Sequence, residues 1–236
     1  MDKIETLKNF LLKSMDLLEY DSVCGKNYKS PNFDLYPNDY LKFAKIELDR
    51  LTNNKNDKLH ILNCVSHLKR AVDCQLDVFL YQLNLYHVVK DNNLKFEKKL
   101  DFIKGIGIIE SSSLARLNRL RNKMEHHYKC PDILEIQVYY DLVNAFVSLI
   151  ESNIVIFLSS SKIYLYTDEC SFKLEYIFED NPKIIFNLRY WEDLEPPLSV
   201  TVDFSERKEF EYYLKVLIIL GKCFLLNIHL DKDKLL

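Results

Sequence analysis

The sequence predicts an α+β protein in which a helical bundle is followed by a small antiparallel β-meander covered by a C-terminal helix. Up to about residue 158, apolar residues recur every three or four positions, which is typical of amphipathic helices. Between Lys162 and Phe204 they alternate with polar residues, which indicates strands with one buried face. Residues 205–228 are apolar on most of their surface and predict a helix that covers the sheet. We therefore expect a helical bundle over residues 1–158 and a small α+β domain over residues 159–236.

Six segments of the first part are predicted to be helical. The longest has an apolar stripe that runs from Ile61 to Tyr86, which is long enough for the spine of a bundle. The connection over residues 24–38 is rich in Gly, Pro, Asn and Ser and is predicted to be a loop. The helices are expected over residues 2–18, about 38–51, 57–89 and 96–103, then over a basic stretch that follows Ser111, Ser112 and Ser113, and finally over residues 132–157.

Four strands are predicted in the second part. Asp180-Asn181-Pro182 and Glu195-Pro196-Pro197 supply turn residues between them. This part has no cluster of His, Cys or carboxylate residues, so the sequence assigns no chemistry to it. The strands are expected over residues 163–166, 172–178, 184–190 and 198–204.

Composition and charge limit the class of protein. Hydrophobic residues make up 48% of the 236 residues, with only 4 Gly and 6 Pro, so we expect a well-packed globular protein. The net charge of −3 means that any attraction to nucleic acid must come from a local basic patch. The 6 cysteines form no CxxC pair and the N-terminus has no signal-peptide pattern, which favours a cytoplasmic protein with reduced thiols. The apolar residues 214–226 are too few to span a bilayer, so a buried helix is expected there.

The stretch Arg121-Asn-Lys-Met-Glu-His126-His-Tyr128 carries the clearest chemical signal. An arginine can hold a phosphate through two parallel hydrogen bonds, and a histidine that titrates near neutrality can accept or donate a proton. These are the groups that phosphodiester chemistry needs when no metal takes part. Four further cations of the same predicted helix can hold a nucleic-acid backbone, namely Arg116, Arg119, Lys123 and Lys129.

This stretch resembles the motif of the HEPN superfamily, in which an arginine is followed after four to six residues by a histidine. The polar residue directly after the arginine is Asn122 here. The fuller pattern Arg-x4-His-x-Tyr is similar to the HEPN toxins that are paired with minimal nucleotidyltransferases, whose tyrosine receives a nucleotide from the antitoxin. The resemblance covers about residues 1–158 and does not extend to the C-terminal part. It implies an all-α bundle with a long antiparallel helical pair, a short helix, the motif and a closing helix.

The resemblance implies a metal-independent endoribonuclease without a cofactor, such as a toxin or a phage-defence effector. On one straight helix, Arg121 and His126 lie too far apart around the axis to hold the same phosphate, whereas residues 122 and 126 are neighbours. The resemblance resolves this with a homodimer, in which Arg121 and His126 of both subunits form one composite site. Asn122 would orient the ring of His126, and Tyr128 is the candidate for modification. Besides RNA, the implied partner is an antitoxin or another regulatory protein, and no membrane.

Other interpretations of the motif stay open. A basic helix with a histidine is common, Arg121 and Glu125 can form an exposed ion pair, and Tyr128 stands where a core aromatic residue is expected. The bundle can also be a non-catalytic module that binds RNA, nucleotide or a protein partner, with the strand-rich part as its interaction surface. The two hypotheses differ at His126, because only a nuclease loses cleavage when this residue is replaced.

A zinc site is the other chemistry that the sequence permits. His60, Cys64 and His67 share one face of the long predicted helix, and these are zinc-ligand types. A cysteine on a core stripe explains the pattern more simply, because cysteine is among the most buried residue types. We therefore predict no metal site. The short Gly105-Ile-Gly107 turn lacks the third glycine and the preceding strand of a phosphate-binding loop.

Overall fold

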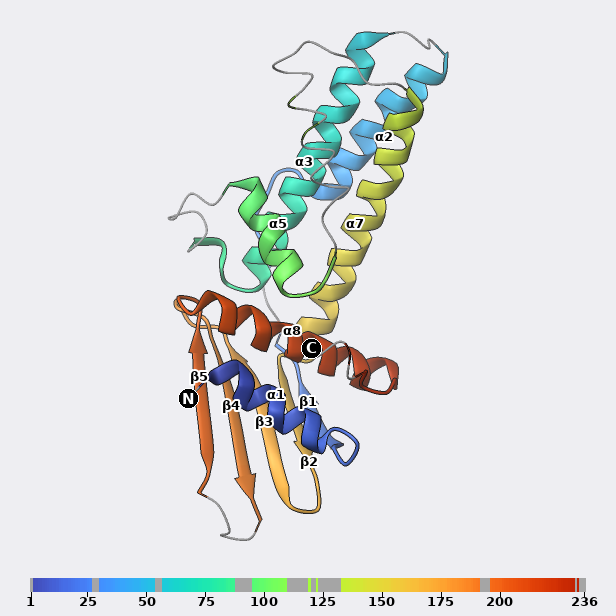
Figure 1. Cartoon of the computed structure of the whole chain (residues 1–236). Helices are drawn as coiled ribbons and strands as arrows, with labels where there is room; N and C mark the ends of the chain where they lie inside the picture. Colours follow the sequence, from blue (N-terminus) through green and yellow to red (C-terminus); the bar gives the residue numbers. More distant parts are fainter. Residues whose placement is uncertain are drawn as a thin grey trace.

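The structure is a computed structural model that describes residues 2–26, 30–53, 57–87, 95–109, 119, 122, 133–191, 196–231 and 233. Within these residues the chain forms six helices with described bounds and one five-stranded antiparallel sheet. The helical arm stands at one end of the molecule and the sheet at the other (Figure 1). The predicted α+β class is therefore confirmed.

Three long helices form the arm. α2 (Pro37–Asn53) and α3 (Lys58–Gln82) lie side by side, and α7 (Ile133–Ser159) packs against both (Figure 1). The short helix α5 (Phe96–Gly105) contacts α3. Each long helix turns an apolar stripe inward, as the spacing of three and four predicts. Residues with no exposed surface on these stripes include Leu51, Leu68, Phe79, Val143 and Ile150.

Helix α3 ends before the predicted end at about residue 89. Asn84 takes a left-handed backbone conformation with φ of 56°, and the Leu85 amide donates to the Leu80 carbonyl over 2.8 Å. Asparagine tolerates this conformation better than most residues, so it can close a helix. The apolar pattern continues past the end of α3 because Leu83 and Leu85 are also fully buried. This explains why the pattern predicted a longer helix.

The sheet has the strand order β1-β2-β3-β4-β5, and each pair is antiparallel. Four of its strands are those that the alternation predicted. The sequence analysis missed β1, because the bulge between Tyr20 and Ser22 interrupts its alternation and an edge strand buries little. The strands are β1 (Glu19–Cys24), β2 (Lys162–Tyr166), β3 (Cys170–Ile177), β4 (Lys183–Tyr190) and β5 (Leu198–Asp203).

Helix α1 (Lys3–Ser14) also belongs with the sheet. The ring of Phe10 stacks on that of Phe172 in β3, with centroids 5.3 Å apart and planes 6° from parallel. The Tyr213 hydroxyl of α8 (Arg207–Leu226) donates to the Lys3 carbonyl over 2.7 Å. Residues 2–26 therefore pack with the C-terminal part of the chain, although the sequence analysis placed them with the helical bundle. A local apolar pattern predicts a helix but not the partner against which it packs.

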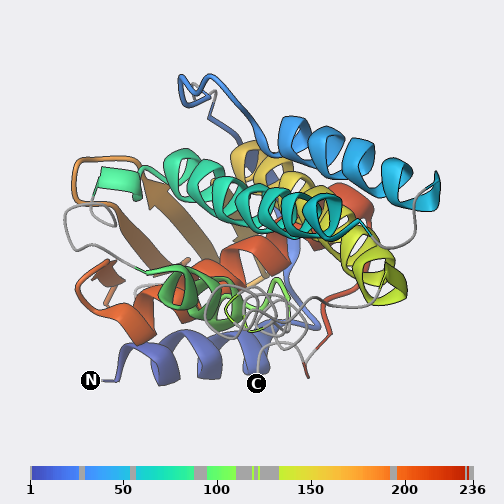
Figure 2. The same cartoon turned by 90° about the horizontal axis from the view of Figure 1, so that it is seen from above.

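Both α1 and α8 cover the same face of the sheet (Figures 1 and 2). On this inner face Phe172, Leu174 and Phe186 are buried and form the core with α8. The helix predicted around residues 214–226 is confirmed, and α8 buries residues on most of its sides up to Cys223. The expected burial is wrong for the last turn, where Phe224, Leu225 and Leu226 are exposed. The opposite face carries the polar positions of the alternating strands, and none of them is buried. We call it the open face.

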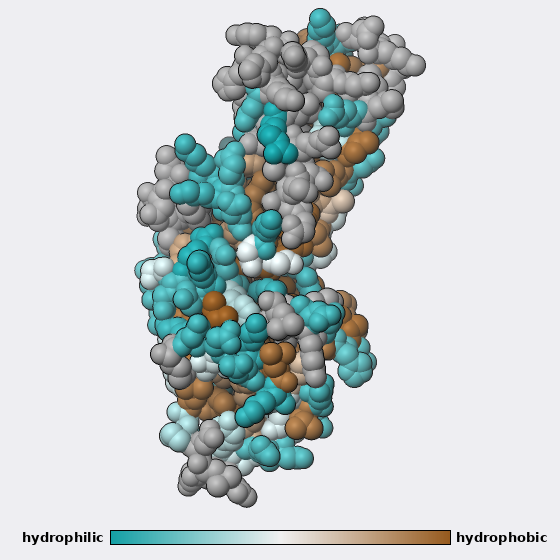
Figure 3. Space-filling view, viewed as in Figure 1, coloured by the Kyte–Doolittle hydropathy of each residue, from teal (hydrophilic) through white to brown (hydrophobic). Residues whose placement is uncertain are grey.

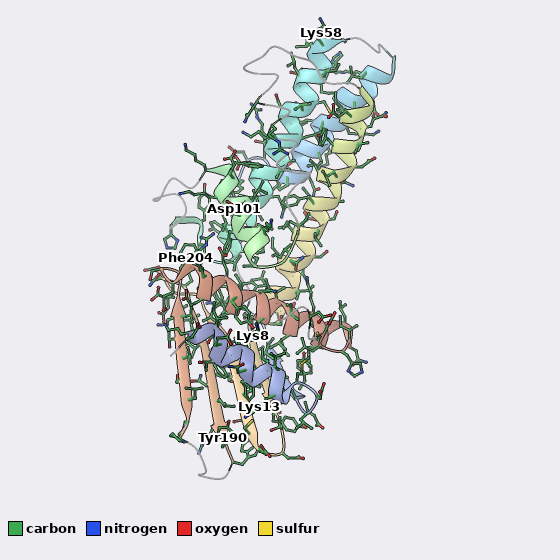
Figure 4. The ribbon with its side chains drawn as sticks, in the orientation of Figure 1. Lys8, Lys13, Lys58, Asp101, Tyr190 and Phe204 are labelled. Carbon is green, nitrogen blue, oxygen red and sulfur yellow. The ribbon has the colours of Figure 1, made fainter. Side chains whose placement is uncertain are left out.

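One continuous core joins the arm to the sheet. Phe204, which follows β5, meets Phe102 of α5 edge to face at 6.1 Å (Figure 4). The Arg207 guanidinium lies 4.4 Å from the ring centroid of Phe102 and 5.0 Å from that of Phe204. Gly221 of α8 approaches α7 so closely that an added Cβ would overlap the side chain of Ser160. These contacts hold the end of the arm against the sheet.

Among the described helices, one segment, Glu135–Ser159 of α7, is long and apolar enough to cross a membrane. Its inner stripe packs on α2 and α3, and its last turns contact α8. Val138, Leu149 and Val155 are exposed, and hydrophobic atoms are visible along the outer side of α7 in Figure 3. Length and composition alone do not separate a membrane span from the core helix of a bundle.

Candidate functional site

Two of the predicted site residues lie within the described part of the chain. Arg119 and Asn122 are both in helical conformation and both exposed. Both side chains are therefore accessible to solvent. The other predicted residues lie outside the described residues, and the structure therefore does not show whether they come together; they are Arg121, His126, Tyr128, Arg116, Lys123 and Lys129.

The structure does describe what precedes and follows the motif. After α5, the Gly107 amide donates to the Lys104 carbonyl over 2.9 Å and the Ile108 amide to the Ile103 carbonyl over 3.2 Å. Gly107 has a φ of 71°, which favours glycine at the end of a helix. The side chains of Ile106 and Ile108 are buried on one side of the motif, and that of Ile136 in α7 is fully buried on the other. Both flanks are thus fixed to the core.

His60 and Cys64 of α3 form interhelical contacts with α2. His60 Nδ1 lies 2.5 Å from Oε2 of Glu47, which is buried, and Arg50 Nη1 lies 3.2 Å from Glu47 Oε1. The Cys64 thiol donates to the Ala44 carbonyl over 3.4 Å. Within the described residues, no group of three or more His, Cys, Asp or Glu residues is placed to hold a metal ion. These side chains fasten α3 to α2, which is the simpler explanation of the pattern.

The environment of the thiols predicts their reactivity. Burial, together with the charge of Glu47, raises the pKa of Cys64 to about 12, and burial with nearby carboxylates raises that of Cys74 to about 11. Cys24 is exposed. Because the thiolate is the reactive form, iodoacetamide at about pH 8 is expected to modify Cys24 well before Cys64 and Cys74. Peptide mass spectrometry measures this order, and equal labelling of Cys24 and Cys64 in the native protein would contradict the packing of α2 on α3.

A second charged cluster fastens α5 to α3. Lys99 Nζ lies 2.6 Å from Asp77 Oδ1 and 3.1 Å from Asp73 Oδ1. Burial raises the pKa of Asp77, although the hydrogen bond and charge of Lys99 oppose this rise. Lys99 of α5 pairs with both carboxylates of α3. These contacts position α5 and therefore also the turn between α5 and the motif.

Replacing Lys99 with methionine is expected to destabilise the protein by about 1–3 kcal/mol near neutral pH, because two carboxylates lose their cation and stay where they are. Without Lys99, the pKa of Asp77 rises further. A carboxyl group whose pKa is raised by folding stabilises the folded state at low pH and loses this contribution as the pH rises. The difference in unfolding free energy between Lys99→Met and wild type should therefore shrink on acidification from about pH 7 to about pH 4. Urea denaturation at both pH values tests this, and a growing difference would contradict it.

A cavity of about 430 Å³ lies between α1 and the end of the sheet far from the arm. Lys13 of α1 and Tyr190 of β4, both labelled in Figure 4, line it together with Glu169. No histidine or arginine is among its described lining residues. It therefore lacks the two side-chain types on which the motif's phosphodiester chemistry depends.

The sequence analysis offered the strand-rich part as an interaction surface but named none of the residues of the open face. Tyr164 and Tyr166 of β2 point outward, and the paired positions on β3 are Lys173 and Ser171. The signal was available, because residues between the buried ones of an alternating strand face the other side of the sheet. Histidine and cysteine patterns do not indicate such a face, because stacking and charge surfaces use tyrosine, lysine and arginine.

Comparisons with protein-family models, with curated proteins and with solved structures find no match for this chain. Support for a function therefore comes from the chain itself. It consists of the motif between Arg121 and Tyr128, the exposed helical residues Arg119 and Asn122, and the open face of the sheet.

Proposed function

We propose that this chain is a metal-independent endoribonuclease of the HEPN type. The observation that carries the proposal is the pattern Arg121-Asn122-x3-His126-x-Tyr128 in the sequence. Two findings support it. Arg119 and Asn122 are helical and exposed, as residues that meet RNA must be. The order of the described helices, with the long pair α2 and α3, the short α5, then the motif and the closing α7, is also the order that the resemblance implies.

In the proposed reaction the 2′-hydroxyl of the RNA attacks the adjacent phosphorus atom and the bond to the 5′-oxygen breaks. The imidazole of His126 acts either as the base that accepts the proton of the 2′-hydroxyl or as the acid that donates a proton to the leaving 5′-oxygen. Arg121 stabilises the charge that develops on the phosphoryl oxygens. The products are a 2′,3′-cyclic phosphate and a 5′-hydroxyl. DNA has no 2′-hydroxyl and is not a substrate of this mechanism.

The proposal includes a homodimer. Residues 121 and 126 are about 140° apart around a straight helix, so one helix does not direct both side chains at the same phosphate. Two motif helices that face each other across a two-fold axis supply both groups from both subunits. Light scattering that finds a monomer at assay concentrations, together with full activity, would contradict the composite site.

The test of the proposed function is incubation of the purified protein with total cellular RNA in EDTA. Cleavage that leaves 2′,3′-cyclic phosphate ends is the expected result. Cleavage that requires added divalent cations, or that leaves 3′-hydroxyl ends, would contradict the proposal. A cytoplasmic toxin or phage-defence effector restrained by an antitoxin is the biological setting that the resemblance implies.

A second candidate function is a non-catalytic module that binds RNA, nucleotide or a protein partner. The observation that favours it is the open face, where most side chains are polar and all are exposed or half-buried. In this case wild-type protein shows no cleavage that replacing His126 could remove. Arg121→Ala is then expected to weaken binding, and a filter-binding measurement would record the loss.

A further inference from the structure

The open face is fully described, and none of the described helices covers it. Its outward residues come from all five strands, and each of them is exposed or partly exposed. α1 and α8 lie on the other side of the sheet, where Phe10 stacks against Phe172. The open face consists of Glu19, Ser22, Cys24, Lys162, Tyr164, Tyr166, Ser171, Lys173, Glu175, Ile177, Lys183, Ile185, Asn187, Arg189, Ser199, Thr201 and Asp203.

Two aromatic rings stand next to each other on this face. Tyr164 and Tyr166 are two residues apart on β2, so both side chains leave the same side of the sheet. Tyr166 is 37% exposed, and its hydroxyl donates to Glu19 over 2.6 Å. A tyrosine on an open sheet presents a flat apolar surface on which an unpaired base can stack.

Basic side chains lie beside Tyr164, whereas the carboxylates of Glu19, Asp21 and Asp168 lie near Tyr166. Lys162 Nζ lies 5.1 Å from the ring centroid of Tyr164, and Lys173 stands directly across from Tyr164 on β3. Glu175 holds both lysines, with Lys162 Nζ at 3.3 Å and Lys173 Nζ at 2.8 Å from its carboxylate. The outward strand positions carry four cations and three carboxylates, and Asp21 in the bulge of β1 and Glu179, which pairs with Lys183 over 2.9 Å, add two more carboxylates; the cations are Lys162, Lys173, Lys183 and Arg189.

We propose that the open face binds single-stranded RNA. Bases stack on Tyr164 and Tyr166, and phosphates contact Lys162, Lys173 and Arg189. The inference rests on the proposed function, because it gives the RNA substrate a binding surface on the part of the chain that does not contain the motif. The tyrosine rings match the stacked bases of a single strand, and the neighbouring cations match its phosphates. A protein interface of this size would be expected to have an apolar centre. The open face has only two aliphatic residues, Ile177 and Ile185, which favours RNA over a protein partner.

Fluorescence anisotropy with a labelled single-stranded RNA tests the proposal in the His126→Ala chain, in which cleavage does not interfere. Tyr164→Ala is expected to weaken binding roughly fivefold to a hundredfold, because one stacking surface is lost. Lys173→Ala should weaken binding and lower the slope of log K against log salt by about 0.7, the value for one lost phosphate contact. Lys13→Ala is the matched control, since Lys13 is an exposed lysine of α1 on the other side of the sheet (Figure 4).

Glu175→Gln gives a result of opposite sign. It removes the carboxylate that holds Lys162 and Lys173, so both ammonium groups become available to phosphates. RNA binding is expected to tighten several-fold at low salt and to depend more steeply on salt. A structural defect would not produce tighter binding, so this variant separates a binding role from loss of fold.

Unchanged affinity in Tyr164→Ala, Lys173→Ala and Glu175→Gln would overturn the proposal, as would equal weakening by Lys13→Ala. Absence of measurable affinity for the single-stranded RNA in the His126→Ala chain would overturn it too. In the chain with His126 intact, Tyr164→Ala should raise KM and leave kcat unchanged. Weakened binding in these variants without any cleavage by wild type would retain the open face and refute the nuclease. Cleavage with unchanged KM would retain the nuclease and refute the open face.

Discussion

Replacing His126 with alanine is expected to lower the rate of RNA cleavage in EDTA by roughly a hundredfold to ten-thousandfold. General acid–base catalysis by a positioned imidazole contributes about this much. The fold and most of the affinity for RNA should be retained, because phosphate binding is assigned to Arg121 and to the neighbouring cations. Gel analysis of cleavage over time, with circular dichroism and anisotropy on the same preparation, measures all three properties.

His127→Ala provides the matched control for this variant. His127 is the adjacent imidazole and occupies the variable position of the motif, so its loss should leave the cleavage rate within a few-fold of wild type. An equal loss of cleavage rate in both variants would indicate that the substitutions damage the helix and that His126 has no catalytic role. Full activity in His126→Ala would show that the motif does not carry the chemistry.

The largest effect on stability is expected from Phe172→Ala. Phe172 is 1% exposed, and its ring lies 5.3 Å from those of both Phe10 and Phe186. Truncation of a buried phenylalanine costs about 3–5 kcal/mol, because transfer free energy is lost and a cavity remains. This is a large share of the stability of a typical domain. Urea denaturation followed by circular dichroism measures the change.

Lys173→Ala is the control on the same strand. Lys173 is the next residue of β3 and points to the open face, so its truncation is expected to change the unfolding free energy by no more than about 0.5 kcal/mol. A small effect of Phe172→Ala would contradict the packing of α1 on the sheet. A large effect of Lys173→Ala would show that the open face is covered by something that stabilises it.

The sequence predicts those elements whose pattern lies within one short segment, and it does not predict contacts between segments that are distant in the chain. The alternation in residues 162–204 predicts four strands, because burial of one face of a sheet leaves a direct record in every second residue. Strand β1 has no such record: its bulge between Tyr20 and Ser22 breaks the period, and its partner β2 is more than a hundred residues away in the chain. The position of α1 on the sheet has the same cause, since Phe10 and Phe172 are distant in sequence.

The candidate site divides in a similar way. A short motif such as Arg121 to Tyr128 can be recognised in the sequence because its spacing is local. The contact of His60 with Glu47 joins two helices and depends on how α3 packs on α2, so helical periodicity alone does not predict it. The cluster of Tyr164, Lys162 and Lys173 requires the pairing register of β2 with β3. Contacts between elements are thus the part that only the structure supplies.

The most direct test of the central claim uses an RNA whose main cleavage position has been mapped. A second RNA of the same sequence carries a single 2′-deoxynucleotide at that position, and both are incubated with the wild-type protein in EDTA. The account predicts that cleavage at this bond disappears in the substituted RNA, because the 2′-hydroxyl is the attacking group, while cleavage elsewhere continues. Undiminished cleavage at the deoxy position would show that water or another nucleophile attacks the phosphate, and would contradict the proposed mechanism.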